Sequence, residues 1–375
     1  MKKFLITLLL LAVTIKSAYT NNQSNELLKS LAQFGFENIR LYEQDDITII
    51  DYENRIYIRE KDAVKTIISK TKDFYPDIDR LYLISRKNDT PILSFSVKIG
   101  TEGEYDIEYA AVKHQNIKKY NSSSGKIDII IRPEFDSLLG RFSDPMIYQL
   151  AISPEISTSI TKQLKTSLQL KLFLYDELSN KEQTLSLGRF CFYYLHHRNS
   201  SSLLNLSGGY FGNNRYGMFS EYNHLFVNNN LTLGIMAAWL GNIYYWSDKF
   251  YYTRLWKWTS LGKVQYKLPI WNMILTARLG RFLHLDNGFR FEVTRLFRHT
   301  CLTIFVAKTS EESIGGFNIK LIPYPRKHMK PDRIRVRLPS LLIMNYRYAE
   351  SDAARVFSST YGIDHFIQRH WLMDL

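Results

Sequence analysis

The sequence has little of what most enzymes need. Its 375 residues include only two cysteines, Cys191 and Cys301, which excludes a disulfide-stapled scaffold and any zinc site built from several cysteines. It also lacks a glycine-rich phosphate loop, a Gly-x-Ser-x-Gly elbow and a His-Glu-x-x-His pair. We therefore expect no catalytic residue, no cofactor and no metal site, and we interpret the chain as a non-enzyme.

Two small groups of residues come closest to catalytic chemistry. Cys191 precedes His196 and His197, but adjacent histidines on a strand point to opposite faces, and nothing near them supplies further ligands. Asp286 and Glu292 have the residue types of a glycosidase pair. We interpret both groups as structural.

The structural interpretation of the second group rests on turn chemistry. The segment Asp286-Asn287-Gly288 has the composition of a turn, because Gly288 is able to adopt a positive φ. Glu292 then lies on the same polar strand face as Arg290, where an ion pair between the two is expected.

A long apolar run is also absent. The apolar stretch from Phe4 to Val13 is shorter than the roughly 20 residues that a membrane-spanning helix needs. Lys2 and Lys3 precede it, and small or polar residues follow it up to Thr20, which is the layout of a secretory signal peptide. We expect residues 1–20 to be a signal peptide and the mature protein to be exported.

Residues 21–126 read as a small α+β domain and a linker. This segment carries a net charge of −1, although the whole chain carries +13. Apolar residues at helical spacing predict helices over 25–36 and 61–74, the first ended by Gly35. Short β-like runs predict strands over 39–41, 47–50, 56–58, 81–84 and 92–97.

Residues 127–375 have a different pattern of polar and apolar residues and carry a net charge of +11. Helical periodicity is absent, and segments of about ten residues alternate polar and apolar side chains. The cleanest are Leu231–Trp239, Lys263–Leu268 and Gly316–Leu321, and clusters of Asn, Gly, Asp and Ser separate them. Roughly 12–14 such segments predict a transmembrane antiparallel β-barrel followed by a C-terminal tail.

Aromatic residues make up 14% of the chain, and five of the six tryptophans lie between residues 239 and 271. Such clusters are typical of the aromatic girdles of membrane barrels, where rings lie at the two membrane–water interfaces. A soluble, aromatic-rich β-sandwich shows similar alternation. The export signal, the number of strand segments and the tryptophans favour the barrel.

Six basic residues share the polar phase of their strands, opposite an apolar stripe. In a barrel this phase faces the lumen, because a charge facing lipid costs roughly 2–4 kcal/mol at mid-depth. A basic lumen attracts an acidic polymer, while a lumen filled by internal ion pairs is the alternative. Nucleic acid is not expected as a partner, since the chain is exported and has no nucleic-acid-binding pattern. The six residues are Lys171, Lys263, Lys267, Arg278, Arg290 and Lys320.

Three segments resemble one family. The stretch from Gly280-Arg281 through Asp286 and Gly288 to Phe297, followed by Gly315-Gly316-Phe317, resembles YjbH-like outer-membrane proteins of exopolysaccharide and capsule production. Phe34 to Ile39, followed by Tyr52-Glu53-Asn54-Arg55, is similar to the N-terminal part of that family. The segments occur in the family's order, and the resemblance covers most of the mature chain.

The resemblance implies a bacterial outer-membrane barrel with a small periplasmic α+β domain that acts in polysaccharide secretion. It implies outer-membrane lipid, an acidic polysaccharide, a small lipoprotein and a soluble periplasmic protein as partners. Longer family members have about twice this length and two barrels, whereas this chain has room for one. Two alternatives stay open: a general diffusion porin or structural barrel, and a secreted soluble all-β carbohydrate-binding protein.

Overall fold

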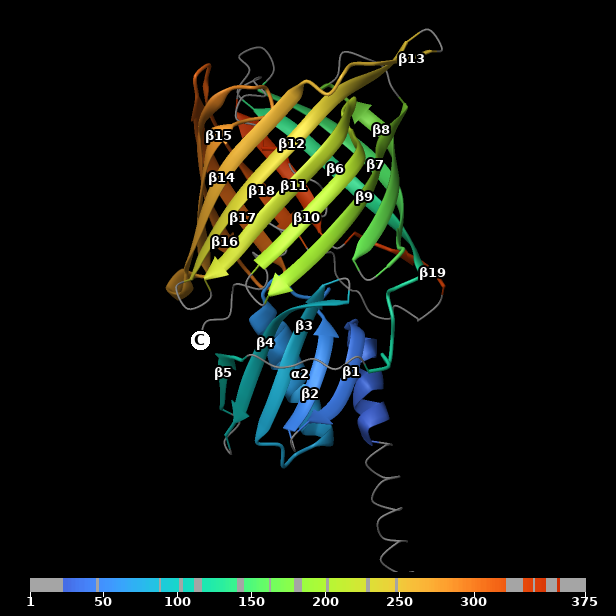
Figure 1. The fold of residues 1–375 in the computed structure, drawn as a ribbon, viewed down its shortest axis with the longest axis vertical. Helices are drawn as coiled ribbons and strands as arrows, with labels where there is room; N and C mark the ends of the chain where they lie inside the picture. The colour runs from blue at the N-terminus through green and yellow to red at the C-terminus, as the bar shows by residue number, and fades with distance from the viewer. Residues whose placement is uncertain are drawn as a thin grey trace, which may run out of the picture.

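The protein consists of a small N-terminal domain and a β-barrel stacked along its longest axis (Figure 1). The computed structural model describes residues 23–44, 47–87, 89–100, 104–110, 117–139, 145–161, 163–178, 184–199, 202–226, 230–246, 249–321, 333–339, 341–348 and 356–357. The signal peptide expected over residues 1–20 lies outside the described residues. We call the end of the barrel nearest the N-terminal domain the lower end and the opposite end the upper end.

The N-terminal domain has an α+β fold, as its helical and β-like segments predict. A helix over residues 23–34 precedes a five-stranded sheet in the order β1-β2-β3-β4-β5. Helix α2 connects β2 to β3, which pair in parallel, and the other strand pairs are antiparallel. The bounds are β1 Glu37–Gln44, β2 Ile47–Glu53, α2 Glu60–Phe74, β3 Arg80–Lys87, β4 Thr90–Ile99 and β5 Tyr105–Tyr109.

The core of this domain forms where both helices pack on one face of the sheet. Leu27 and Leu31 of the first helix and Val64 and Ile67 of α2 are fully buried in it. Their spacing of three or four residues places each pair on one helix face. Gly35 ends the first helix with φ +102°, a conformation that glycine adopts without steric cost.

The strand expected over residues 56–58 is not formed. The side chain of Asn54 accepts hydrogen bonds from the backbone N–H groups of Ile56 and Tyr57, both at 3.0 Å, which holds the chain in a turn. The N–H of Ile58 donates to the carbonyl of Arg298 in the barrel at 3.1 Å. The apolar run was therefore misassigned because these residues are buried against the barrel rather than in a sheet.

The second part of the chain forms a closed barrel of thirteen strands, within the expected range of 12–14. Neighbours in the chain pair as antiparallel strands from β6 to β12 and from β14 to β18. The barrel strands are β6 Ile127–Leu139, β7 Met146–Ser159, β8 Leu164–Asp176, β9 Leu185–Asn199, β10 Ser202–Gly212, β11 Arg215–Phe226, β12 Leu231–Trp246, β14 Lys257–Leu268, β15 Met273–Arg281, β16 Asn287–Leu296, β17 Thr300–Thr309, β18 Ser313–Leu321 and β20 Leu342–Tyr348. The short β13 (Lys249–Tyr252) pairs antiparallel with the last residues of β12, and a 3₁₀ turn (Pro269–Trp271) follows β14.

The barrel closes through a parallel seam. β6 and β20 run in the same direction, and Met344–Tyr348 pair with Phe135–Leu139. The four-residue β19 (Ile334–Arg337) pairs with the start of β6, also in parallel. Between the two stretches, the Arg132 side chain donates a hydrogen bond to the Leu341 carbonyl at 3.4 Å. An odd number of strands requires one such parallel pair.

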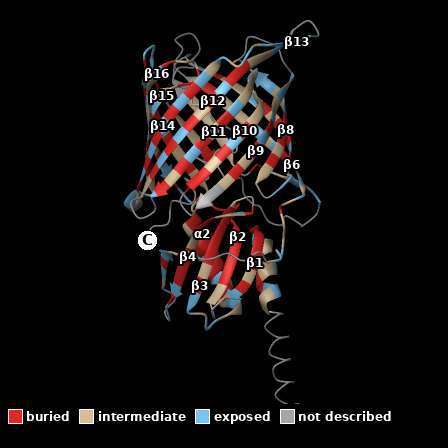
Figure 2. Ribbon diagram, in the orientation of Figure 1, coloured by how far each residue is buried: buried red, intermediate tan, exposed pale blue. Residues whose placement is uncertain are grey.

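Side chains alternate along the strands between a buried inner face and an exposed outer face, which Figure 2 shows as alternating colours. In β12, Leu233 and Ile235 are exposed, while Thr232, Gly234 and Met236 are buried. This is the division that period two predicts. Within the described residues, no helix is long and apolar enough to cross a membrane.

The tryptophans whose side chains the structure describes lie at both ends of the barrel. Trp239 and Trp258 pair across β12 and β14 and are exposed on the outer face. Trp271 lies in the 3₁₀ turn at the lower end and is also exposed. Ten residues separate Trp258 from Leu268, and at roughly 3.3 Å per residue and a tilt of about 40° they span roughly 25 Å along the axis.

Candidate functional site

The six basic residues predicted to face the lumen all lie on the inner face of the barrel. Lys263, Lys267, Arg278 and Lys320 are buried, while Arg290 and Lys171 are partly buried. Their sequence neighbours on the outer face, such as Val264 and Leu279, are exposed. The alternation of each strand therefore places these side chains as the sequence predicts.

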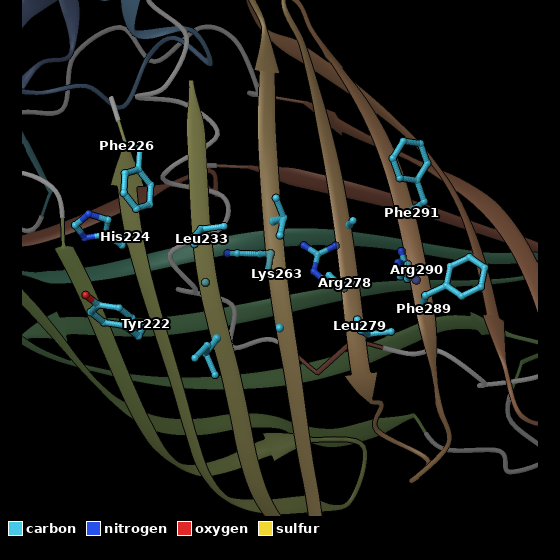
Figure 3. A pocket seen from close by; sticks show the side chains of 15 residues that line it. Tyr222, His224, Phe226, Leu233, Lys263, Arg278, Leu279, Phe289, Arg290 and Phe291 are labelled. Carbon is cyan, nitrogen blue, oxygen red and sulfur yellow. The ribbon is translucent and has the colours of Figure 1, made fainter. Parts of the chain in front are cut away.

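Three of the six basic residues form a row across adjacent strands. Lys263 on β14 pairs in register with Arg278 on β15, which pairs with Arg290 on β16 (Figure 3). Like charges directly opposite one another are unfavourable, and two carboxylates offset them. Glu221 lies 3.3 Å from Lys263. Glu292 lies 2.6 Å from Arg278 and 2.7 Å from Arg290.

The row also has an aromatic neighbour. The guanidinium of Arg290 lies 3.7 Å from the ring centroid of Phe305, a cation–π contact. Gly316 makes room for this ring, because a Cβ on Gly316 would lie 2.7 Å from its nearest ring carbon. Gly315 has no such neighbour and lies on the outer phase. Of the two glycines in this motif, one therefore shapes the interior.

The remaining basic residues stand apart from the row. On β8, Lys171 donates a hydrogen bond to Gln149 at 2.6 Å and lies 3.5 Å from Glu134. Lys320 on β18 pairs in register with Cys301. The structure brings three of the six together and distributes the others around the wall, so the inner charge forms a lining and not a single pocket.

Hydroxyl and amide side chains occupy many other buried positions of the inner face. They lie on strands all around the barrel, as the inward phase of each strand predicts. These groups both donate and accept hydrogen bonds. Examples are Ser153, Ser157, Ser167, Gln169, Asn205, Ser207, Asn223, Thr232, Gln265, Thr276, Thr294 and Thr303.

Near the upper end the inner face is apolar. Phe219, Met236, Ala238, Leu240, Leu261, Phe305, Ala307 and Ile314 form one buried cluster with Phe282 and Leu283 of the β15–β16 loop, and Phe211, Val356 and Phe357 pack against it. The cluster joins walls from β11 to β18 through residues that belong to no barrel strand. We call it the upper apolar cluster. No pattern in the sequence predicted it.

The segment from Gly280 to Gly288 builds the loop that enters this cluster. Gly280 has φ +138°, and a Cβ there would lie 2.2 Å from the Ser260 carbonyl oxygen, so only glycine fits. The N–H of Phe282 donates to the Asp286 carbonyl at 2.8 Å. Arg281 points to the outer face, where its guanidinium lies 4.6 Å from the Trp258 ring centroid.

The expected turn at Asp286-Asn287-Gly288 needs correction. Asn287 and Gly288 begin β16, and Leu285 is the residue with positive φ, at +71°. Gly288 is required for close approach instead, since a Cβ there would lie 2.2 Å from the Lys308 carbonyl oxygen. Asp286 is buried in the loop, whereas Glu292 is held by two arginines on the barrel wall.

The motif Tyr52-Glu53-Asn54-Arg55 lies where the N-terminal domain meets the barrel. Arg55 contacts Glu37 at 2.9 Å and Glu53 at 3.1 Å. Glu37 is shared with Arg335 of β19 at 3.0 Å, and Arg335 contacts Asp128 of β6 at 2.7 Å. Burial alone lowers the pKa of Arg55, but the carboxylates of Glu37 and Glu53 outweigh it and raise the pKa.

The rest of this motif is structural. Asn54 forms the turn described above, and its amide also donates to Glu60 at 2.9 Å. Tyr52 is fully buried, with its ring edge-on to Phe36 at 5.8 Å, and burial raises the pKa of its hydroxyl. The motif thus joins the domain core to the charged junction.

Apolar contacts complete the junction. Leu195, Leu203 and Leu225, at the lower ends of β9, β10 and β11, belong to the same buried cluster as the core of the N-terminal domain. Tyr57 stacks on His299 in the β16–β17 turn at 5.6 Å. The N-terminal domain therefore packs onto the lower mouth of the barrel.

Cys191 and His196 lie on opposite faces of β9. Cys191 points inward, and its thiol donates to the Tyr210 carbonyl at 2.9 Å, whereas His196 stacks on the outward Tyr194. The side chain of His197 lies outside the described residues. No group of three or more metal-ligating side chains occurs among the residues that the structure describes.

Comparison with known proteins adds no further constraint. No family model matches the chain, and no curated protein is detectably similar to it.

Proposed function

We propose that the protein is an outer-membrane β-barrel that acts in the export or assembly of an exopolysaccharide or capsule. The observation that carries this proposal is the combination of a closed barrel, an apolar outer face and an inner face lined by basic, hydroxyl and amide side chains. The family resemblance of the three motif segments adds the link to polysaccharide. No enzymatic step is required of the chain.

The outer face supports insertion in a membrane. Exposed leucine, isoleucine, phenylalanine and tyrosine side chains occur on strands from β6 to β18, far more than a monomeric soluble protein exposes. On β11–β16, apolar side chains line an outer groove with a volume of ≈ 910 Å³ (Figure 3). Hydrocarbon chains of outer-membrane lipid suit this groove, and a secreted soluble carbohydrate-binding protein does not suit such a surface.

The inner face supports a sugar polymer as the cargo. Serine, threonine, asparagine and glutamine side chains hydrogen-bond sugar hydroxyls, and Lys263, Arg278 and Arg290 attract carboxylate or phosphate groups on an acidic polysaccharide. The upper apolar cluster argues against a general diffusion porin, whose lumen is a water-filled channel. The N-terminal domain, in the periplasm, is the surface for a soluble periplasmic partner and a small lipoprotein.

Charge reversal in the lumen tests this proposal. Replacement of Lys263, Lys267, Arg278 and Arg290 by Glu should lower the surface polymer at least about tenfold, because repulsion in a confined channel is weakly screened. Arg290 should contribute least, since Glu292 and the ring of Phe305 together hold its guanidinium. Surface polymer is measured by immunoblotting, and barrel assembly by heat-modifiable mobility on a detergent gel.

The matched control is Lys308→Glu, because Lys308 lies on the outer face of β17 and is exposed. It should leave polymer output unchanged. If the fourfold Glu variant fails to assemble, the corresponding Gln variant removes the charge without reversing it. Normal polymer output from an assembled variant would exclude the lumen as the conduit, and normal output from a strain without the protein would exclude the function.

A further inference from the structure

The outer face of the barrel carries positive charge in one sector. Among the barrel-strand residues whose side chains the structure describes, Asp, Glu, Lys and Arg occur at three outward positions, Arg281, Arg295 and Lys308, and all three are basic. They lie on the neighbouring strands β15, β16 and β17. Arg281 and Lys308 lie near the upper end of the barrel, and Arg295 lies near the lower end.

Tryptophans hold Arg281 at the upper end. Its guanidinium lies 4.6 Å from the ring centroid of Trp258, a cation–π contact, and Trp258 pairs in register with Trp239 on β12. The indole N–H of Trp239 donates to the Leu255 carbonyl at 2.9 Å, which fixes the orientation of that ring. Tryptophan prefers the depth of the lipid headgroups. In the proposed membrane barrel, Arg281 therefore lies at headgroup depth.

Two apolar grooves of the outer face meet beside Arg281. The first is the groove of ≈ 910 Å³ on β11–β16, and Leu279, two residues below Arg281 on the same face, is part of its lining (Figure 3). The second has a volume of ≈ 810 Å³ and extends over β8–β14. Its lining includes Trp258 and Ser260, and Ser260 is the register partner of Arg281. We call them the first groove and the second groove.

A glycine keeps space open in each groove. Gly262 lines the first groove and Gly208 lines the second. The backbone requires glycine at neither position, because a Cβ there would lie 3.8 Å from the nearest atom, a carbonyl oxygen, and φ is not positive. A larger side chain would therefore fill the groove without disturbing the strands.

We propose that this sector binds an anionic lipid whose headgroup carries phosphate, with the phosphate on Arg281 and one acyl chain in each groove. Arginine forms charge-assisted hydrogen bonds with phosphate, and the apolar linings suit hydrocarbon. The inference rests on the proposed function only where it places the outer face in a membrane. It adds the recognition of one class of lipid at the end of the barrel opposite the N-terminal domain.

Native mass spectrometry of the full-length protein in detergent tests this site without any polysaccharide. The probes are phosphatidylglycerol, which is anionic, and phosphatidylcholine with the same acyl chains, which has no net charge. Wild-type protein should retain phosphatidylglycerol at least about fivefold better, because one arginine at headgroup depth contributes about this factor. Arg281→Gln should abolish the preference, and Arg281→Lys should keep most of it.

The matched control is Lys308→Gln, because Lys308 is an exposed cation of the same face that lines neither groove. It should leave the lipid preference unchanged. Gly262→Leu should reduce the retention of both lipids alike, since the new side chain fills the first groove. Inorganic phosphate in excess should not displace the lipid, because it lacks acyl chains. Heat-modifiable mobility confirms that each variant has assembled.

Three results would each overturn the lipid site. They are equal retention of the two lipids by wild type, equal effects of Arg281→Gln and Lys308→Gln, and displacement of the lipid by inorganic phosphate. If Arg281→Gln does not assemble, unchanged retention by Gly262→Leu would overturn the site as well. If the lipid preference is found while charge reversal in the lumen leaves polymer output unchanged, the lipid site stands and the polysaccharide function fails.

Discussion

Ile235 and its neighbours show that the position of a residue along a strand, odd or even, decides on which face of the barrel its side chain lies. Ile235 is exposed on the outer face of β12, whereas Gly234 and Met236 on either side of it are buried in the interior. The side-chain period of a strand is two, so a shift of one position exchanges the two environments. In the proposed membrane barrel, a charge on the inner face therefore meets water and counter-charges, whereas a charge on the outer face meets hydrocarbon.

Replacement of Ile235 by Arg should reduce the stability of the inserted barrel by roughly 2–4 kcal/mol, because the guanidinium would face lipid. Ile235→Leu should change it by less than about 1.5 kcal/mol. Lys320→Gln, on the inner face of β18, should leave insertion intact. Urea titration of the refolded protein in lipid vesicles measures all three. Equal losses for Ile235→Arg and Lys320→Gln would mean that the two faces are not lipid and water.

The same alternation explains which site residues could be predicted from the sequence. Lys263 and Arg278 were assigned to the lumen because each alternates with apolar neighbours. The stretch from Met236 to Leu240 is apolar on both faces, so the inward Met236, Ala238 and Leu240 have no sequence signal that separates them from the outward positions. The upper apolar cluster was missed for this reason.

At the scale of elements, the junction between the domain and the barrel depends on a short turn and not on a strand. Asn54 bends the chain so that Ile56, Tyr57 and Ile58 reach the barrel, and Arg55 enters the charged junction. The sequence predicted both helices and most strands of this domain. It did not predict β5, and it wrongly placed a strand over residues 56–58, since apolar residues that face another domain have the same composition as a short strand.

Replacement of Arg55 by Ala should loosen this junction by about 3–5 kcal/mol, because it leaves Glu37 and Glu53 buried with one cation fewer. Hydrogen–deuterium exchange should become faster in residues 54–59 and at the start of β6, with the barrel strands otherwise unchanged. Lys70→Ala breaks an exposed pair with Asp73 in the same domain and should cost less than about 1 kcal/mol. Unchanged exchange in the Arg55→Ala variant would contradict this account of the junction.

At the scale of the whole molecule, the parallel seam is where the barrel has the fewest pairs. β20 contributes five register pairs to β6, whereas β7 contributes thirteen on the other side. Asn345 also donates to Asp136 across the seam at 3.1 Å, although the two residues are 209 positions apart. The alternation of polar and apolar residues predicts a closed sheet. The number of strands and the pair that closes the barrel depend on where each strand ends, and the alternation does not determine these ends.

A disulfide between Asp136→Cys and Asn345→Cys, with Cys191 and Cys301 replaced by Ala, should form readily because the two positions are register partners. Oxidation should stabilise the barrel by up to roughly 5 kcal/mol, since it constrains a very long loop in the unfolded chain. The urea midpoints of the oxidised and reduced protein measure this difference. Absence of the cross-link in assembled protein would show that β6 and β20 are not neighbours in this register.

The odd strand count also decides on which side of the barrel the chain emerges. With thirteen strands, β6 and β20 both run upward, so Tyr348 ends at the mouth opposite the N-terminal domain. A barrel with twelve or fourteen strands would return the chain to the side on which it started. Val356 and Phe357, eight and nine residues after Tyr348, pack against the upper apolar cluster. Loss or gain of a single strand in evolution would therefore bring the end of the last strand to the other mouth of the barrel, beside the N-terminal domain.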